Sequence, residues 1–160
     1  MKRVICILLL AVLLFSGCAN QPKEPVTFYY VRSDFETDMS AVIASESREA
    51  SGHLGDLPYL MALYCMGPAE EELHSPLPAG ISILSARQEA SNVTLQLTDT
   101  TELMTDSQFT LACSCLTLTC LDITQAEYVT INSGDRSVTM GAEILVLQDV
   151  TTGSRTEETK

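Results

Sequence analysis

The stretch ISILSARQEASNVTLQL, residues 81–97, carries the clearest structural pattern of the chain. Residues 81–88 are predicted to form a strand, and residues 90–92 a turn. Residues 93–97 then alternate strictly between apolar and polar types, as in a strand with one buried face. The stretch therefore predicts a β-hairpin that needs a second layer to cover it. The side chains expected on its buried face are Val93, Leu95 and Leu97.

A helix is predicted shortly before this hairpin. Asp56 suits the N-cap position, and Pro58 falls in the first turn, where its missing N–H costs little. Residues 57–64 place apolar side chains at i, i+3, i+4 and i+7, which is one helical face. Gly67-Pro68 is expected to end the helix.

A second, longer helix is predicted after the hairpin. Thr105 and Gln108 have the spacing of a capping box at a helix start. Residues 109–120 carry one apolar stripe and further apolar side chains on the other side, so this helix should be well buried.

The remaining strands complete the fold prediction. Residues 26–31, 128–131, 137–140 and 144–150 read as strands. Residues 40–49 are predicted to form a second, exposed strand, with a helix as the alternative. The order is thus β-β-α-β-β-α-β, with one or two strands after it. This order predicts an α+β fold with a single mixed or antiparallel sheet and two helices packed on one face.

The N-terminus has the three parts of an export signal. Lys2 and Arg3 precede an apolar run, residues 4–15, that is too short to span a bilayer. Residues 14–18, Leu-Phe-Ser-Gly-Cys, resemble the lipobox of bacterial lipoproteins. The resemblance implies removal of a signal peptide, residues 1–17, and attachment of acyl chains such as palmitate to Cys18.

Lipidation of Cys18 would anchor the protein to the extracytoplasmic face of the cell membrane through residues 18–25, a short polar tether. Two alternatives are an ordinary secretory signal cut near Ala19 and an uncleaved anchor.

Charge narrows the range of partners. The chain has 160 residues and a net charge of −12, and loss of the two basic signal residues leaves about −14, from 7 − 21. Nucleic-acid binding is driven by Lys and Arg, so this composition argues against it. The acidic surface also argues against a domain that lies flat on anionic lipid.

The ordered set of these elements resembles the GerMN domain of sporulation and spore germination proteins. The resemblance covers most of the chain after the signal and is assigned to residues 26–150, with residues 151–160 predicted to be a disordered tail. Its marks are Phe28-Tyr29-Tyr30-Val31, Leu63-Tyr64-Cys65-Met66-Gly67-Pro68, Leu77-Pro78-Ala79-Gly80-Ile81 and Tyr128-Val129-Thr130-Ile131-Asn132-Ser133-Gly134.

Two residues depart from the family pattern: Ile81 stands where threonine is usual, and Ser133 where aspartate is usual. The resemblance implies a role in sporulation or germination through contacts with envelope or spore proteins. It implies neither catalysis nor a cofactor.

Few residues suggest chemistry. The two histidines, His53 and His74, have no partner at ligand or catalytic spacing and are expected to have surface or capping roles. On a helix, Cys113 and Cys120 would lie about 10.5 Å apart along the axis, beyond the ~7 Å between Cα atoms that a disulfide allows. Core packing is therefore the main expectation for Cys113, Cys115 and Cys120.

These observations predict a membrane-anchored, non-enzymatic interaction module of the spore or cell envelope. The alternative is an envelope lipoprotein that handles thiols or a metal through Cys113, Cys115 and Cys120. A third interpretation is a small-ligand-binding lipoprotein, for example for a germinant.

Overall fold

The computed structural model describes residues 24–34 and 42–143. The predicted α+β class and the predicted order of elements are confirmed, with one short extra strand, β3. The signal peptide, Cys18, the strand predicted at residues 144–150 and the tail lie outside the described residues. The elements are β1 (Pro25–Arg32), β2 (Ile43–Glu49), α2 (Leu57–Cys65), β3 (Leu73–His74), β4 (Ile83–Glu89), β5 (Asn92–Leu97), α3 (Asp106–Thr124), β6 (Tyr128–Ser133) and β7 (Arg136–Gly141).

The strands form two sheets, where the sequence predicted one. The order is β2-β1-β3 in the first sheet and β4-β5-β6-β7 in the second. The second sheet is mixed, as predicted among the alternatives: β5 and β6 are parallel, and the outer pairs are antiparallel.

The two sheets stay separate because helix side chains satisfy one edge of β1. The N–H of Tyr29 donates to Thr119 Oγ1 of α3 at 3.0 Å. The carbonyl of Tyr29 accepts from Tyr64 Oη of α2, also at 3.0 Å. A backbone edge whose groups already have partners has no need of another strand. On the edge opposite β2, β1 pairs with the two residues of β3 at Val31 and Arg32.

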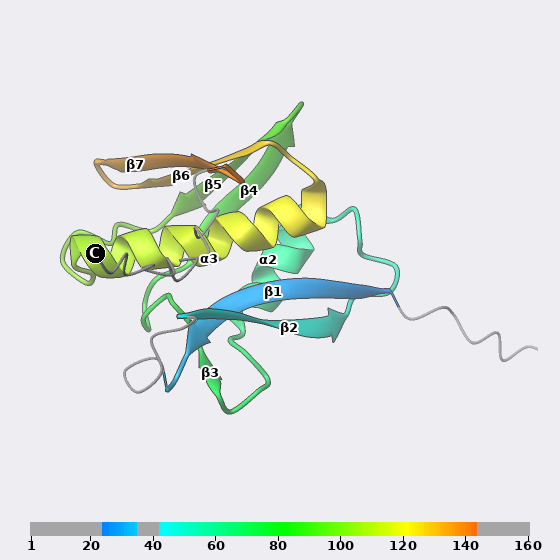
Figure 1. The fold of residues 1–160 in the computed structure, drawn as a ribbon. Coiled ribbons are helices and arrows are strands. Elements are labelled where there is room, and N and C mark those ends of the chain that lie inside the picture. Colours follow the sequence, from blue (N-terminus) through cyan, green and yellow to red (C-terminus); the bar gives the residue numbers. More distant parts are fainter. Residues whose placement is uncertain (1–23, 35–41, 144–160) are drawn as a thin grey trace, which may run out of the picture.

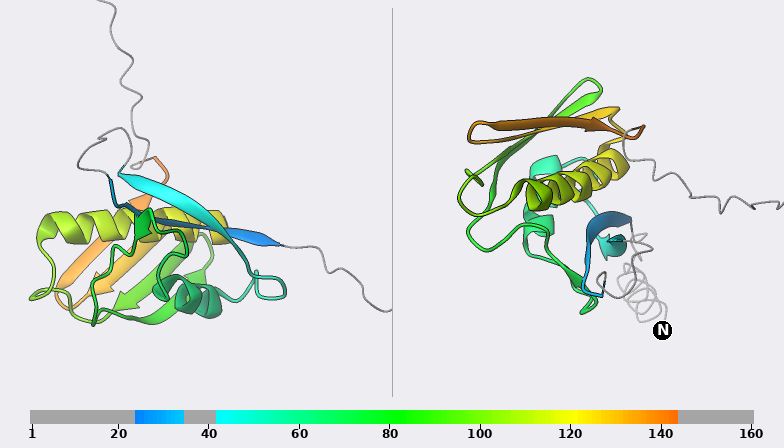
Figure 2. Two further views of the ribbon diagram at one scale, coloured as in Figure 1. Left: turned by 90° about the horizontal axis from the view of Figure 1, so that it is seen from below. Right: turned by 60° about the vertical axis from the view of Figure 1, so that its left-hand side comes forward.

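Both helices lie between the two sheets (Figure 1). On one side, α2 packs against β4 and α3 packs against β6 and β7, so both helices cover the same face of the four-stranded sheet, as predicted. On the other side, β1 packs across α3, so the three-stranded sheet covers the opposite side of this helix. Figure 2 shows this packing from two further directions. A helix covered on two sides must be largely apolar on both, and residues 109–120 accordingly contain no charged side chain.

The hairpin confirms the predicted buried face. Val93, Leu95 and Leu97 of β5 are each at most 1% exposed, and Val129 and Ile131 of the parallel strand β6 are fully buried beside them. β4 begins at Ile83, two residues later than predicted, and its register shifts between Ile83 and Ser85. The buried apolar side chains of β5 and β6 therefore form part of the sheet face that the helices cover.

Two tyrosines join α2 to β1. The rings of Tyr30 and Tyr64 stack with centroids 4.7 Å apart and an interplanar angle of 7°. Tyr30 Oη donates to the carbonyl of Tyr64 near the end of α2, at 3.0 Å, and Tyr64 Oη donates back to β1. Both polar tips are thus satisfied inside the core, and the two elements are fixed in one relative position.

The predicted helix starts are also confirmed. The side chain of Asp56 accepts from the N–H of Tyr59 at 3.1 Å. Thr105 and Gln108 form the reciprocal bonds of a capping box. Gly67 follows α2 with φ +82°, a conformation that favours glycine.

Candidate functional site

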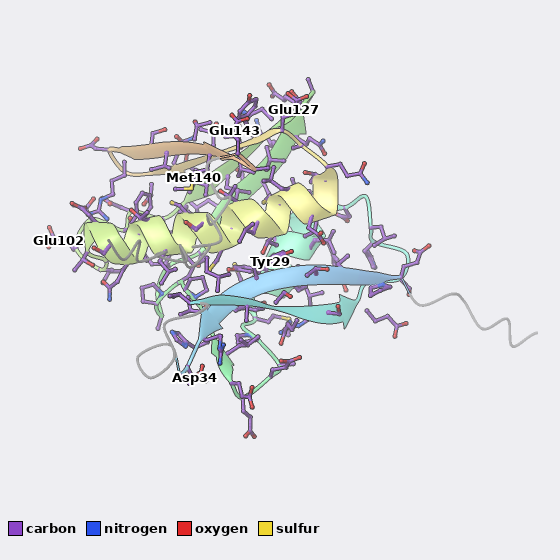
Figure 3. The ribbon with its side chains drawn as sticks, in the orientation of Figure 1. Tyr29, Asp34, Glu102, Glu127, Met140 and Glu143 are labelled. Carbon is purple, nitrogen blue, oxygen red and sulfur yellow. The ribbon has the colours of Figure 1, made fainter. Side chains whose placement is uncertain are left out.

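The anchoring residue predicted from the sequence, Cys18, lies outside the described residues. The described chain starts at Glu24, and β1 follows at once. β1 begins at one end of the domain, and α3 begins at the opposite end (Figure 1). The side chain of Glu102 marks the end where α3 begins in Figure 3. Within residues 24–34 and 42–143, no helix has the length and apolar character needed to cross a bilayer.

The three helix cysteines lie in the core as free thiols. Cys113, Cys115 and Cys120 are all 0% exposed. Burial raises the pKa of each thiol to about 12. Cys120 Sγ lies 3.8 Å from Met61 Sδ of α2. A protonated, covered thiol is a poor nucleophile and a poor metal ligand, so this arrangement suits packing better than redox or metal chemistry.

The fourth thiol, Cys65, lies at the end of α2 and is exposed to solvent. Its sulfur is still partly covered by neighbouring groups, and this partial burial raises the pKa of the thiol. Across the described ranges, no cluster of three or more His, Cys, Asp or Glu residues could hold a metal ion.

The two histidines lie apart from each other and from the thiols. His53 stacks on the ring of Tyr59, with centroids 3.9 Å apart. His74 belongs to β3 and lines a cavity of about 270 Å³ at the end of the domain where α3 begins.

This cavity is mostly apolar. Gln108 is one of its few polar groups, and its Oε1 already accepts a bond from the N–H of Thr105. The volume of the cavity is slightly below the range of about 300–1,000 Å³ that is usual for small-ligand sites. The lining residues are Val31, His74, Ser75, Pro76, Pro78, Leu103, Met104, Gln108 and Leu111.

A buried ion pair occupies the strand that the sequence predicted to be exposed. Glu46 of β2 is only 4% exposed, and Arg48 Nε lies 2.5 Å from Glu46 Oε1. Glu46 and Arg48 pair with Phe28 and Val26 of β1, so they share a face with its buried side chains. The prediction of an exposed strand is therefore wrong for this face.

The ion pair is fully engaged in holding the chain after α2. Glu46 accepts from the N–H groups of Ala69 and Glu70. Arg48 donates to the carbonyls of Leu63 and Gly67. With these bonds made, the pair has a structural role rather than a catalytic one. The sequence did contain a signal for this ion pair. Glu46 and Arg48 have opposite charges and stand two residues apart in a strand, so their side chains lie on the same face.

The four-stranded sheet turns its second face to solvent. The register aligns Thr94 with Thr130 and Thr139, and Gln96 with Asn132 and Ser137. We call these six side chains the outer sheet face. They bond to one another: Thr130 Oγ1 lies 3.0 Å from Thr139 Oγ1, and Ser137 Oγ donates to Asn132 Oδ1 at 2.7 Å. This neutral polar surface, formed from three strands, is the candidate interaction site.

Ser133, one of the departures from the GerMN pattern, is the last residue of β6 and is fully buried on the inner face of this sheet. Its hydroxyl accepts from the N–H of Thr100 at 2.9 Å and donates to the carbonyl of Thr98 at 2.8 Å. Ser133 thus fixes the loop after β5 and has no access to a ligand.

Comparisons with known proteins returned solved structures alone. No family model matches the sequence, and no curated protein matches it. The structure is similar to the tandem GerMN domains of the sporulation protein GerM from Bacillus subtilis, with 15% identity and a TM-score of 0.47. That similarity covers 75% of this chain and 43% of that one, so this chain spans less than half of its length.

The structure is also similar to a lipoprotein candidate from Clostridium perfringens, with 16% identity and a TM-score of 0.45, over 79% of this chain and 94% of that one. A GerMN domain is thus among the solved structures that this chain is similar to, as the sequence marks predicted.

Proposed function

We propose that this protein is a membrane-anchored, non-enzymatic interaction module of the cell or spore envelope that acts in sporulation or spore germination. The observation that carries the proposal is the lipobox cysteine placed immediately before a folded domain. Glu24 follows Cys18 by only six positions. At ~3.3–3.6 Å per residue, this tether reaches at most about 22 Å. The domain would therefore stay beside the membrane that holds Cys18.

The anchored end and the far end of the domain differ in what they can contact. α3 has 19 residues and spans about 28 Å at 1.5 Å per residue. The end where α3 begins can therefore extend away from the bilayer. The acidic chain would be repelled by anionic lipid. A domain held in this way exposes its outer sheet face to other envelope components.

A non-enzymatic role is supported by the engagement of the reactive groups. The helix thiols are covered and protonated, and Glu46 and Arg48 are bonded to each other and to backbone groups. Groups whose hydrogen-bonding capacity is used within the protein stabilise the fold and are not available to a substrate.

Anchoring is tested by fractionation and mass spectrometry of the full chain expressed in a bacterium. The wild-type protein should be in the membrane fraction and carry acyl mass on a mature N-terminus at Cys18. Cys18→Ala should lose both properties. Cys65→Ala, which removes the exposed thiol of the folded domain, is the matched control and should keep both. A wild-type product with an intact leader, or with a mature end that carries no acyl mass, would contradict the proposal.

The developmental role is tested separately in the organism that encodes the protein. A strain lacking the gene should form fewer heat-resistant spores or germinate more slowly. The wild-type gene should restore the phenotype, and Cys18→Ala should not. Normal sporulation and germination in the deleted strain would exclude this part of the proposal.

A further inference from the structure

The outer sheet face lacks charge although the chain is strongly acidic. On β5, β6 and β7, nine positions turn outward, namely the six of the outer sheet face together with Asn92, Tyr128 and Gly141, and none of the nine is charged. Protein surfaces are typically about 25–35% charged, so nine such positions would normally include two or three charges. Charge on this face comes from the edge strand β4, which places Arg87 beside Thr94 and Glu89 beside Asn92. Solubility alone does not require such a neutral area.

An aromatic ring borders this neutral area. Tyr128 of β6 pairs with Gly141 of β7 and is 41% exposed. A Cβ placed on Gly141 would lie 3.0 Å from Tyr128 Cδ1 and 3.2 Å from Cε1. The ring therefore lies across the glycine and occupies the space that a side chain would fill. Glycine at this position lets an aromatic surface rest on the sheet beside the hydroxyl and amide groups.

The hydroxyl groups, amide groups and aromatic ring of this face indicate which class of ligand it could bind. A neutral ring can stack on the C–H face of a sugar, and hydroxyl and amide groups can both donate to and accept from sugar hydroxyl and acetamido groups. A polyanion would be repelled by the net charge of the chain, and a basic partner would prefer its acidic surfaces. An uncharged polyhydroxylated chain is the ligand that matches the neutral face.

The spacing of the rows also fits such a chain. Thr94, Thr130 and Thr139 lie side by side on three adjacent strands. Neighbouring strands are ~4.8 Å apart, which is close to the length of one hexose unit. A glycan that crosses the strands would therefore meet one threonine hydroxyl per sugar.

We propose that the outer sheet face, with the ring of Tyr128, binds a glycan strand of the cell wall through its neutral N-acetylated sugars. The choice of cell-wall glycan rests on the proposed envelope location, whereas the binding itself is a property of the folded domain. Loss of anchoring would therefore leave glycan binding intact, and loss of glycan binding would leave anchoring intact.

The test uses the full-length lipoprotein in detergent micelles. Two probes are used: the hexamer of β-1,4-linked N-acetylglucosamine, measured by calorimetry, and insoluble cell-wall sacculi, measured by co-sedimentation. The wild-type protein should bind both probes. Tyr128→Ala should weaken binding of the hexamer at least tenfold. Tyr59→Ala is the matched control, because Tyr59 is 42% exposed but lies on α2, which packs on the opposite face of the four-stranded sheet; it should bind like the wild type.

A second variant tests the face without removing the ring. Thr130→Val combined with Thr139→Val keeps both side-chain shapes and removes two hydroxyls; it should weaken binding several-fold with an unchanged melting temperature. Absence of wild-type binding to both probes would overturn the proposal. So would equal binding by the wild type, Tyr128→Ala and the double variant. Binding to the hexamer but not to sacculi would retain the sugar site and exclude the cell wall as its source.

Discussion

Alkylation of the folded protein with iodoacetamide at pH 8 tests the placement of the helix thiols. The ordinary pKa of a cysteine here is 9.0, and burial raises it to about 12 for Cys113, Cys115 and Cys120. A difference of three pKa units lowers the fraction of reactive thiolate about 1,000-fold. All three side chains are also 0% exposed, so the reagent must wait for the core to open. Each thiol should therefore react at least about 1,000-fold more slowly than it does in the unfolded chain.

Cys65 provides an internal reference within the same molecule. It is exposed at the end of α2, so it should be modified while the three core thiols remain free. The assay is peptide mass spectrometry over time, with and without guanidinium chloride. Cys65→Ala should remove the early modification and leave the slow phase unchanged.

One result would refute the reasoning. If Cys113, Cys115 or Cys120 were modified in the folded protein as fast as Cys65, the helix thiols would be accessible. The alternative of a thiol- or metal-handling lipoprotein would then be favoured over core packing.

Three further changes should alter stability in measurable ways, and stability should also depend on pH. Because the folded-state pKa of each buried thiol is raised, its stabilising contribution is complete below about pH 9; it falls by up to about 1.4 kcal/mol per pH unit per thiol as the pH rises toward 12, and a constant urea midpoint from pH 8 to 10 would contradict this. Tyr64→Phe keeps the stacked ring but leaves the Tyr29 carbonyl without its donor, so urea unfolding should show a loss of about 1–2 kcal/mol. Glu46→Gln leaves the Arg48 charge without its counter-ion and should cost about 3–5 kcal/mol in the same assay; an unchanged midpoint would show that the pair is dispensable. Gly134→Ala forces a side chain into φ +56° and should cost about 1 kcal/mol or more, and an unchanged melting temperature would contradict the turn geometry.

Local patterns in the sequence were sufficient for the elements that depend on neighbouring residues. The capping box at Thr105 and Gln108, the N-cap at Asp56 and the alternation of residues 93–97 were all confirmed, because each arises from contacts within a few residues. The buried ion pair was not predicted. A polar run such as residues 45–48 is normally solvated, and its burial depends on groups at positions 63–70 that the run itself does not reveal.

The sequence alone determined the two helices, the longer strands, the α+β class and the lipobox, because these follow from short-range periodicity, capping and the order of residue types. The number of sheets was decided only in the tertiary structure. It depends on Thr119 and Tyr64, distant in sequence, satisfying the backbone of Tyr29 at the edge of β1. The outer sheet face likewise exists only once β5, β6 and β7 adopt one register, since that register brings hydroxyls from positions 94, 130 and 139 into a single row.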